Sequence, residues 1–177
     1  MSSRDLSNKH DHEADRVIAK YFTQWAAPGM GGRVTSDRPF HHWDAELWSR
    51  DDAAKLHCLV EIKNRTRYTS RIGWFTDPGV CVSYKQLQEM REAHDYGYLV
   101  IAFKDAMFAL EIGSILEFDY VWEPHNSQKM TDDHGKKPRR TKRSDIDIPK
   151  KYFIQLPEEI WNERICETYL HTAPRNG

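Results

Sequence analysis

The sequence predicts an α/β fold in which a mixed central sheet is flanked by helices. Apolar residues recur at helical spacing near both ends and in the middle of the chain, and short apolar runs typical of strands lie between them. The chain has 177 residues, enough for one domain with one sizeable core. The expected order is helix, hairpin, strand, helix, two strands and a last helix, which describes a mixed sheet covered by helices.

The first third of the chain is expected to form a helix and a hairpin. Residues 1–10 are expected to be a disordered tail, and apolar residues at helical spacing predict a helix over 11–25. The glycine-rich residues 26–32 should end that helix as a flexible loop. Alternating and apolar runs then predict a hairpin with strands near 40–48 and 56–63.

The other segments are assigned from apolar runs, capping residues and turn residues. Ser83 and Gln86 have the spacing of a capping box, and Gly97 is expected to end the helix that they begin. In chain order the segments are a loop at 64–79, a strand at 80–82, a helix from 83 to about 96, strands at 98–103 and 107–112, a short helix from 114 to about 121, a mobile basic loop near 123–149, a strand at 152–154 and a helix after Pro157. We therefore expect a single domain over 11–177.

The composition is typical of a soluble intracellular protein. Charged residues make up 30% of the chain and hydrophobic residues 39%, and no apolar run has the length of a membrane-spanning helix. The polar start of the chain lacks the apolar region of a signal peptide. The three cysteines form no Cys-x-x-Cys motif and are interpreted as reduced thiols. We expect a cytoplasmic or nuclear protein that is not secreted and has no membrane partner.

An acidic residue and a Glu-x-Lys motif fall on the two strands of the expected hairpin. Glu61 and Lys63 close an apolar run, and because side chains two apart share a strand face, they point the same way. Asp44 lies on the neighbouring run. Buried charges are costly unless they are paired or bind a metal. An ordinary ion-pair cluster is the alternative, since Glu-x-Lys is common on solvated strands.

This set, together with the order of elements over residues 11–103, resembles the PD-(D/E)XK nuclease superfamily, which has the restriction-endonuclease-like fold. One departure is that Trp43, rather than proline, precedes Asp44. The resemblance implies a Mg²⁺-dependent DNA endonuclease, with Mn²⁺ as a substitute. It is nearest to small Holliday-junction-resolvase-like or phage nucleases, which implies a homodimer.

The resemblance also implies a role for each residue. Asp44, Glu61, the backbone carbonyl of Ile62 and Glu13 would bind the metal, which activates water for attack on a phosphodiester. Lys63 would position that water and stabilise developing negative charge. Glu13 could equally be a solvated helix carboxylate. Glu46 shares the strand face of Asp44 and could be the metal ligand in place of Asp44.

Two residues at the start of the middle helix also resemble a position beside the active site of resolvases and phage exonucleases. They are Lys85 and Gln86. The alternative is that Gln86 only completes the capping box and Lys85 is solvated, and the two roles can coexist.

Basic residues gather in two segments that could contact nucleic acid. Arg65, Arg67 and Arg71 follow the Glu-x-Lys strand and are interleaved with Tyr68, Trp74 and Phe75, which could stack on unpaired bases or pack in the core. In residues 136–143, six of eight residues are basic, which suits a DNA-binding loop or a localisation signal. These six residues are Lys136, Lys137, Arg139, Arg140, Lys142 and Arg143.

Two other hypotheses stay open. An exonuclease or restriction-type nuclease would use the same residues, and a catalytically silent nucleic-acid-binding protein could share the fold. The histidines do not have the spacing of a structural zinc site, although His42 shares the strand face of Asp44. DNA or RNA as substrate is not decided by the sequence.

Overall fold

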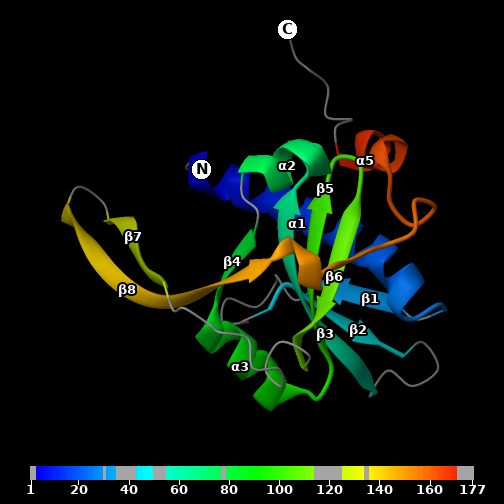
Figure 1. Cartoon of the computed structure of the whole chain (residues 1–177), viewed down its shortest axis with the longest axis horizontal. Helices are drawn as coiled ribbons and strands as arrows, with labels where there is room; N and C mark the ends of the chain where they lie inside the picture. The colour runs from blue at the N-terminus through cyan, green and yellow to red at the C-terminus, as the bar shows by residue number, and fades with distance from the viewer. Residues whose placement is uncertain are drawn as a thin grey trace, which may run out of the picture.

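The computed structural model describes the backbone of residues 3–29, 31–34, 43–49, 55–76, 79–113, 125–133 and 136–170. For residues 3–12, 31–34, 125–133 and 136–147 it describes the backbone alone. The α/β class with a mixed central sheet, expected from the sequence, is confirmed (Figure 1).

The main sheet contains six strands in the order β1-β2-β3-β5-β6-β9. Its strands are β1 (Gly31–Val34), β2 (Ala45–Trp48), β3 (Leu56–Arg65), β5 (Gly97–Phe103), β6 (Met107–Glu111) and β9 (Ile154–Gln155). Strands β3 and β5 pair in parallel and the other neighbours are antiparallel. The expected hairpin is β2 with β3, and the parallel β5 is reached by a crossover.

A smaller sheet has the order β4-β8-β7 and is antiparallel. It contains β4 (Gly79–Ser83), β7 (His125–Asp133) and β8 (Lys136–Pro149). Figure 1 shows β7 and β8 as a twisted ribbon that runs away from the main sheet. The expectation of a loop near 123–149 is therefore wrong for these two segments, because their backbones pair with each other in register. Polar composition hid this pairing, since strands that pair outside a core need no apolar alternation.

Helices cover both faces of the main sheet. They are α1 (Ser3–Ala26), α2 (Ser70–Thr76), α3 (Tyr84–Ala93) and α5 (Glu163–Leu170), and a 3-10 helix spans Lys150–Tyr152. One buried cluster joins Leu59 of β3 and Leu99 of β5 to Leu87 of α3. The other joins Val60 and Ile62 of β3 to α1 and α5. Strand alternation therefore directs Leu59, Glu61 and Lys63 to the face that α3 covers.

Three further boundaries differ from the sequence-based expectation. Helix α1 begins at Ser3 rather than after a disordered tail, because no proline or glycine interrupts residues 3–26. The expectation of a flexible loop over 26–32 is wrong at its C-terminal end, because Gly31 starts β1 and pairs with Trp48. The long loop over 64–79 contains α2, a two-turn helix that propensity alone does not predict.

Other expected boundaries moved less. Asp44 directly precedes β2 instead of lying within it. Helix α3 ends at Ala93 with His94 as its C-cap, so Gly97 begins β5 and does not stop the helix. The expected helix from 114 to about 121, and His42, lie outside the described residues.

Candidate metal centre

Glu61 lies in the middle of β3 with its carboxylate buried and bonded on both oxygens. The residue is 4% exposed. Its Oε1 lies 2.7 Å from the Nζ of Lys63, and its Oε2 accepts a hydrogen bond of 2.7 Å from the Nε2 of Gln86. Glu61 and Lys63 share a strand face, and Gln86 reaches them from α3. The shared face predicted from the sequence is confirmed.

Asp44 is held against the same part of β3 by two backbone contacts. Its Oδ2 accepts a hydrogen bond of 2.7 Å from the N–H of Ile62, and its own N–H donates to the carbonyl of Val60 at 3.0 Å. The ladder ends where Ala45 pairs with Val60, and the Asp44 N–H bonds to the carbonyl of that same Val60, so Asp44 does not continue the regular register. The Asp44 carboxyl still lies close to Glu61, because its charge and a hydrogen bond with it both act on the Glu61 carboxyl.

The environment of Glu61 disfavours a negative charge. The pKa of Glu61 is raised from 4.5 to about 7, first by burial, and then by the charge of Asp44 and a hydrogen bond with it, while Lys63 acts to lower that pKa. One ammonium group therefore does not compensate the two carboxyl groups in this buried position. A second cation close to Asp44 and Glu61 would stabilise the ionised forms of both carboxyl groups.

The backbone of Ile62 faces the same carboxyl pair. In a strand the N–H and carbonyl of one residue point to the same side, and the Ile62 N–H points to Asp44. The Ile62 carbonyl is thus directed to the Asp44 side of β3 and away from β5. Its use as a metal ligand stays a prediction.

Gln86 does more than cap its helix. Ser83 accepts a hydrogen bond of 3.4 Å from the Gln86 N–H, as expected for the N-cap of α3. The Gln86 side chain also donates its amide N–H to Glu61, and because a capping box uses the amide oxygen, the two roles can coexist. Lys85 is exposed and its Nζ lies 3.6 Å from Glu89 Oε1, so the structure separates the two neighbours.

Two other acidic candidates lie in different surroundings. Glu46 is buried, and its carboxylate accepts hydrogen bonds from the indole N–H of Trp43 at 3.2 Å and of Trp48 at 2.8 Å. Asp44, not Glu46, contacts Glu61. Glu13 is exposed on α1, which packs on the opposite face of the sheet from Glu61. Its role as a ligand stays a prediction that no contact among the described side chains supports.

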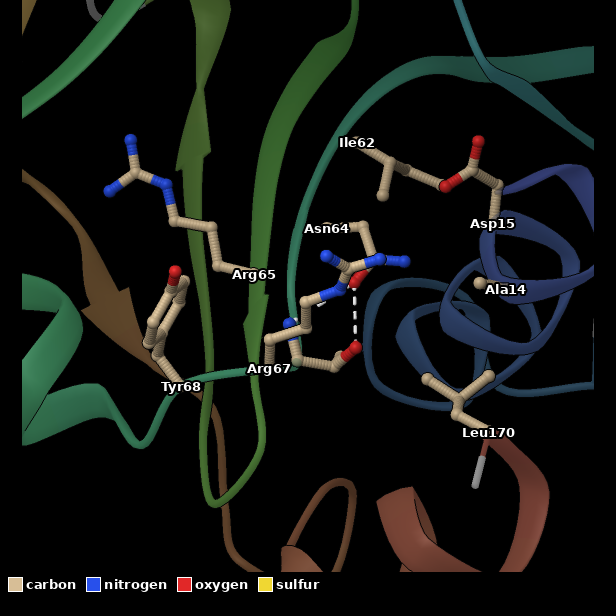
Figure 2. A pocket seen from close by; sticks show the side chains of 9 residues that line it. Ala14, Asp15, Ile62, Asn64, Arg65, Arg67, Tyr68 and Leu170 are labelled. Atoms are coloured by element: carbon tan, nitrogen blue, oxygen red, sulfur yellow. Dashed lines mark hydrogen bonds between the residues drawn. The ribbon is translucent and has the colours of Figure 1, made fainter. Parts of the chain in front are cut away.

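A separate pocket of about 650 Å³ lies where β3 ends. Residues of α1, β3, the following turn and the end of α5 line it. Figure 2 shows the Arg67 side chain in its middle, with Asp15 and Leu170 to one side and Arg65 and Tyr68 to the other. Asn64 lines it too and accepts a hydrogen bond of 2.8 Å from the Thr66 hydroxyl. Asp15 and Asn64 were not predicted from the sequence, although Asn64 directly follows Lys63.

The predicted nucleic-acid-binding residues occupy two regions. Arg65 ends β3, Arg67 follows it in the turn, and Arg71 is exposed on α2. The six basic residues from Lys136 to Arg143 all lie on β8, where the described backbone pairs Arg140 with Met130. Contact of either region with nucleic acid stays a prediction.

The donor set at Glu61 fits a hard cation. Two carboxylates and a backbone carbonyl are oxygen donors of the kind that Mg²⁺ prefers, and Mg²⁺ keeps several waters, so it needs few protein ligands. Among the described residues, no group of three or more His, Cys, Asp or Glu side chains is placed to hold a metal. A site here would therefore rest on two carboxylates. Cys58, Cys81 and Cys166, all within the described residues, form no disulfide, and the first and last are buried.

Comparison with known protein families, curated proteins and solved structures gave no match to this chain. Within the part of the chain that the structure describes, no helix combines the length and apolar character needed to cross a membrane.

Proposed function

We propose that this protein is a divalent-metal-dependent nuclease that hydrolyses phosphodiester bonds in DNA. The observation that carries the proposal is the buried Glu61 carboxylate, bonded to Lys63 and Gln86 and paired with Asp44. An ordinary structural ion pair would join one anion to one cation. Here two carboxyl groups meet one ammonium group, and burial, with a further contribution from Asp44, raises the pKa of Glu61 to about 7.

The residues divide the work in the following way. Asp44, Glu61 and the carbonyl of Ile62 would bind Mg²⁺ or Mn²⁺. The ion supplies Lewis-acid activation of water and of the phosphoryl group. Lys63 has a side chain that is 30% exposed, so its ammonium can reach both Glu61 and a phosphate. It would orient the attacking water and stabilise negative charge that develops on the phosphate. Gln86 fixes the rotamer of Glu61 by holding the second oxygen.

The order of elements supports a place in the PD-(D/E)XK superfamily. Helix α1, strands β1 to β3, helix α3 and strand β5 follow one another as helix, strands, helix and strand, with α2 and β4 inserted before α3. The positions of Asp44, directly before β2, and of Glu61, within β3, support this proposal, because the resemblance calls for an acidic residue on one strand and Glu-x-Lys on the next. A structure-specific, junction-resolvase-like endonuclease that acts as a homodimer is the form we favour.

A nucleic acid is the proposed substrate because basic residues follow the cluster in sequence and lie on β8, and DNA in particular is what the family resemblance implies. Arg65, Arg67 and Arg71 follow it along the chain, and β8 contributes six more cations in residues 136–143. Phosphate contacts of this kind give affinity and register, whereas the cluster would perform the chemistry.

The test is cleavage of plasmid, linear, single-stranded and four-way-junction DNA with Mg²⁺ or with EDTA. Glu61→Gln and Lys63→Ala should each lower turnover at least about 100-fold, the scale of losing one electrostatic contact in the transition state, while circular dichroism stays native. Glu89→Gln is the matched control, because Glu89 lies one turn beyond Gln86 and pairs with the exposed Lys85. Near-normal cleavage by both cluster variants would remove the active-site assignment. Metal binding without any cleavage would favour a silent DNA-binding protein.

A further inference from the structure

An exposed surface of mixed aromatic, aliphatic and cationic character lies on α2 and the turn before it. We call it the α2 patch, and it consists of Arg67, Tyr68, Arg71, Ile72 and Phe75. Phe75 is 90% exposed, Tyr68 54% and Ile72 53%. Single exposed apolar side chains are common, but three on one short segment, with a phenylalanine almost fully in solvent, indicate a binding surface.

Helix α2 is firmly attached to the core, so loose packing does not explain this exposure. Trp74 is buried and its ring lies 5.2 Å from Phe103 and 5.3 Å from Phe108, centroid to centroid. A Cβ on Gly73 would come within 2.1 Å of Phe103, so the helix backbone lies directly on that ring. Asp105 caps the helix by accepting a hydrogen bond of 2.6 Å from the Ser70 N–H. The apolar side chains of the patch are thus held outward by a fixed helix.

The cations of the patch favour a partner of opposite sign, although two acidic side chains lie near it: Asp105, which caps α2, and Asp15, across the pocket from Tyr68 (Figure 2). Residues 64–76 contain three arginines and no acidic residue. Arg67 and Tyr68 also line the pocket at the end of β3, so the patch continues into a hollow (Figure 2). A second copy of the chain is disfavoured, because a twofold contact through the patch would bring its arginines close to their own equivalents.

A polyanion that also offers flat apolar faces satisfies both observations. Nucleic acid does so only where bases are unpaired, because the faces of paired bases are stacked inside the duplex. Aromatic rings stack on such bases and arginines bind the adjoining phosphates. We infer that the α2 patch binds an unpaired segment of the substrate, with Phe75 stacked on a base and Arg67 and Arg71 on the backbone. This inference rests on the proposed function and narrows its substrates to single strands, flaps or branched DNA with unpaired bases at the branch.

The test measures binding in EDTA, so that it depends on neither metal nor cleavage. Fluorescence anisotropy gives the dissociation constant of a labelled single strand and of a duplex of equal length. Phe75→Ala should weaken single-strand binding about tenfold, the scale of one lost base–aromatic stack, and change duplex binding less than about twofold. Phe75→Trp should retain the affinity, and Phe75→Leu, which keeps apolar volume but lacks a ring, should lose it. Tyr96→Ala is the control, because Tyr96 is an aromatic residue outside the patch that is also more than half exposed, 58%.

Three outcomes would overturn the inference. If Phe75→Ala binds the single strand as tightly as wild type does, no base stacks on Phe75. Equal loss on duplex and single strand shows general binding rather than recognition of unpaired bases. A dimer in sedimentation velocity that Phe75→Ala dissociates and Phe75→Leu retains assigns the patch to a second copy of the chain. In each of these cases, the proposed function would still hold if the wild-type protein cleaves DNA and Glu61→Gln does not. Patch-dependent binding without cleavage would instead reject the nuclease and keep this inference.

Discussion

The protonation of Glu61 should govern how the stability of the metal-free protein depends on pH. The pKa of Glu61 is about 7 in the folded protein and near 4.5 when the carboxyl is free in water. The folded state therefore binds this proton more tightly than the unfolded state, and between these two values the unfolded state loses it first. The free energy of unfolding must fall as pH rises through this window.

The magnitude follows from the same two values. One unit of pKa difference corresponds to 1.36 kcal/mol, so ionising Glu61 destabilises the folded protein on the order of 3 kcal/mol. The penalty is absent below about pH 4.5 and fully present above about pH 7. The group is buried, so solvent screening does not remove the effect.

The assay is urea unfolding between pH 5 and pH 8 in EDTA, for wild type and Glu61→Gln. Other groups titrate in both proteins, so the informative quantity is the difference between their free energies of unfolding. Wild type should lose on the order of 3 kcal/mol relative to Glu61→Gln as the pH rises. Mg²⁺ at pH 8 should restore stability to wild type and not to the variant, since binding to the folded state stabilises it.

Parallel pH profiles for the two proteins would refute the reasoning. A relative gain of wild-type stability with rising pH would mean that the Lys63 ion pair dominates and lowers the pKa of Glu61. The cluster would then be an ordinary structural ion pair, which is the alternative that the sequence left open.

Three more outcomes are expected. Asp44→Asn should weaken Mg²⁺ or Mn²⁺ binding in calorimetry more than Glu46→Gln does, because the Glu46 carboxylate is held by two tryptophans. A larger loss of metal binding in Glu46→Gln would identify Glu46, and not Asp44, as the ligand. Neutralising the basic residues of β8 should weaken the binding of catalytically inactive protein to all DNA sequences; these residues are Lys136, Lys137, Arg139, Arg140, Lys142 and Arg143. The slope of the logarithm of the binding constant against the logarithm of the salt concentration should become shallower by up to about five units, because fewer counterions are released. An unchanged slope would favour a localisation or partner-binding role. Gly73→Ala should lower the free energy of unfolding by roughly 1–3 kcal/mol, because its Cβ would overlap the Phe103 ring, and a neutral result in urea would show that α2 can shift.

The sequence was sufficient for the parts of the fold that bury apolar side chains. Leu59, Val60 and Ile62 follow strand alternation and fall into the two core clusters, one on each face of β3. The N-cap at Ser83 was also predictable, because a hydroxyl at that position satisfies a backbone N–H of the helix it starts. The pairing of Glu61 with Lys63 followed from the same period of two.

Features that depend on long-range pairing were not predictable from the sequence. Residues 125–143 of the ribbon contain Met130 as their only large hydrophobic residue, so pairing there leaves no hydrophobic pattern to detect. The alternation of Ile146 and Ile148 with aspartates at the end of β8 did carry a strand signal, and both isoleucines pair with β4. Helix α2 follows from the tertiary fit of Gly73 and Trp74 against Phe103, which lies on a distant strand. The same fit determines which aromatic residues are exposed. Trp74 is buried in the core while Phe75, its neighbour in sequence, is in solvent.

The placement of Gln86 links the fold to the proposed chemistry. Gln86 lies at the third position of the helix, where its N–H bonds to the N-cap Ser83, and its side-chain amide N–H crosses to β3 and holds Glu61. This contact needs the crossover from β3 to the parallel β5, because that connection places the start of α3 over the middle of β3. An amide group stabilises the ionised carboxylate without adding a second positive charge. The net negative charge of the two carboxyl groups therefore stays available to a divalent cation, which an arginine or lysine at position 86 would have neutralised.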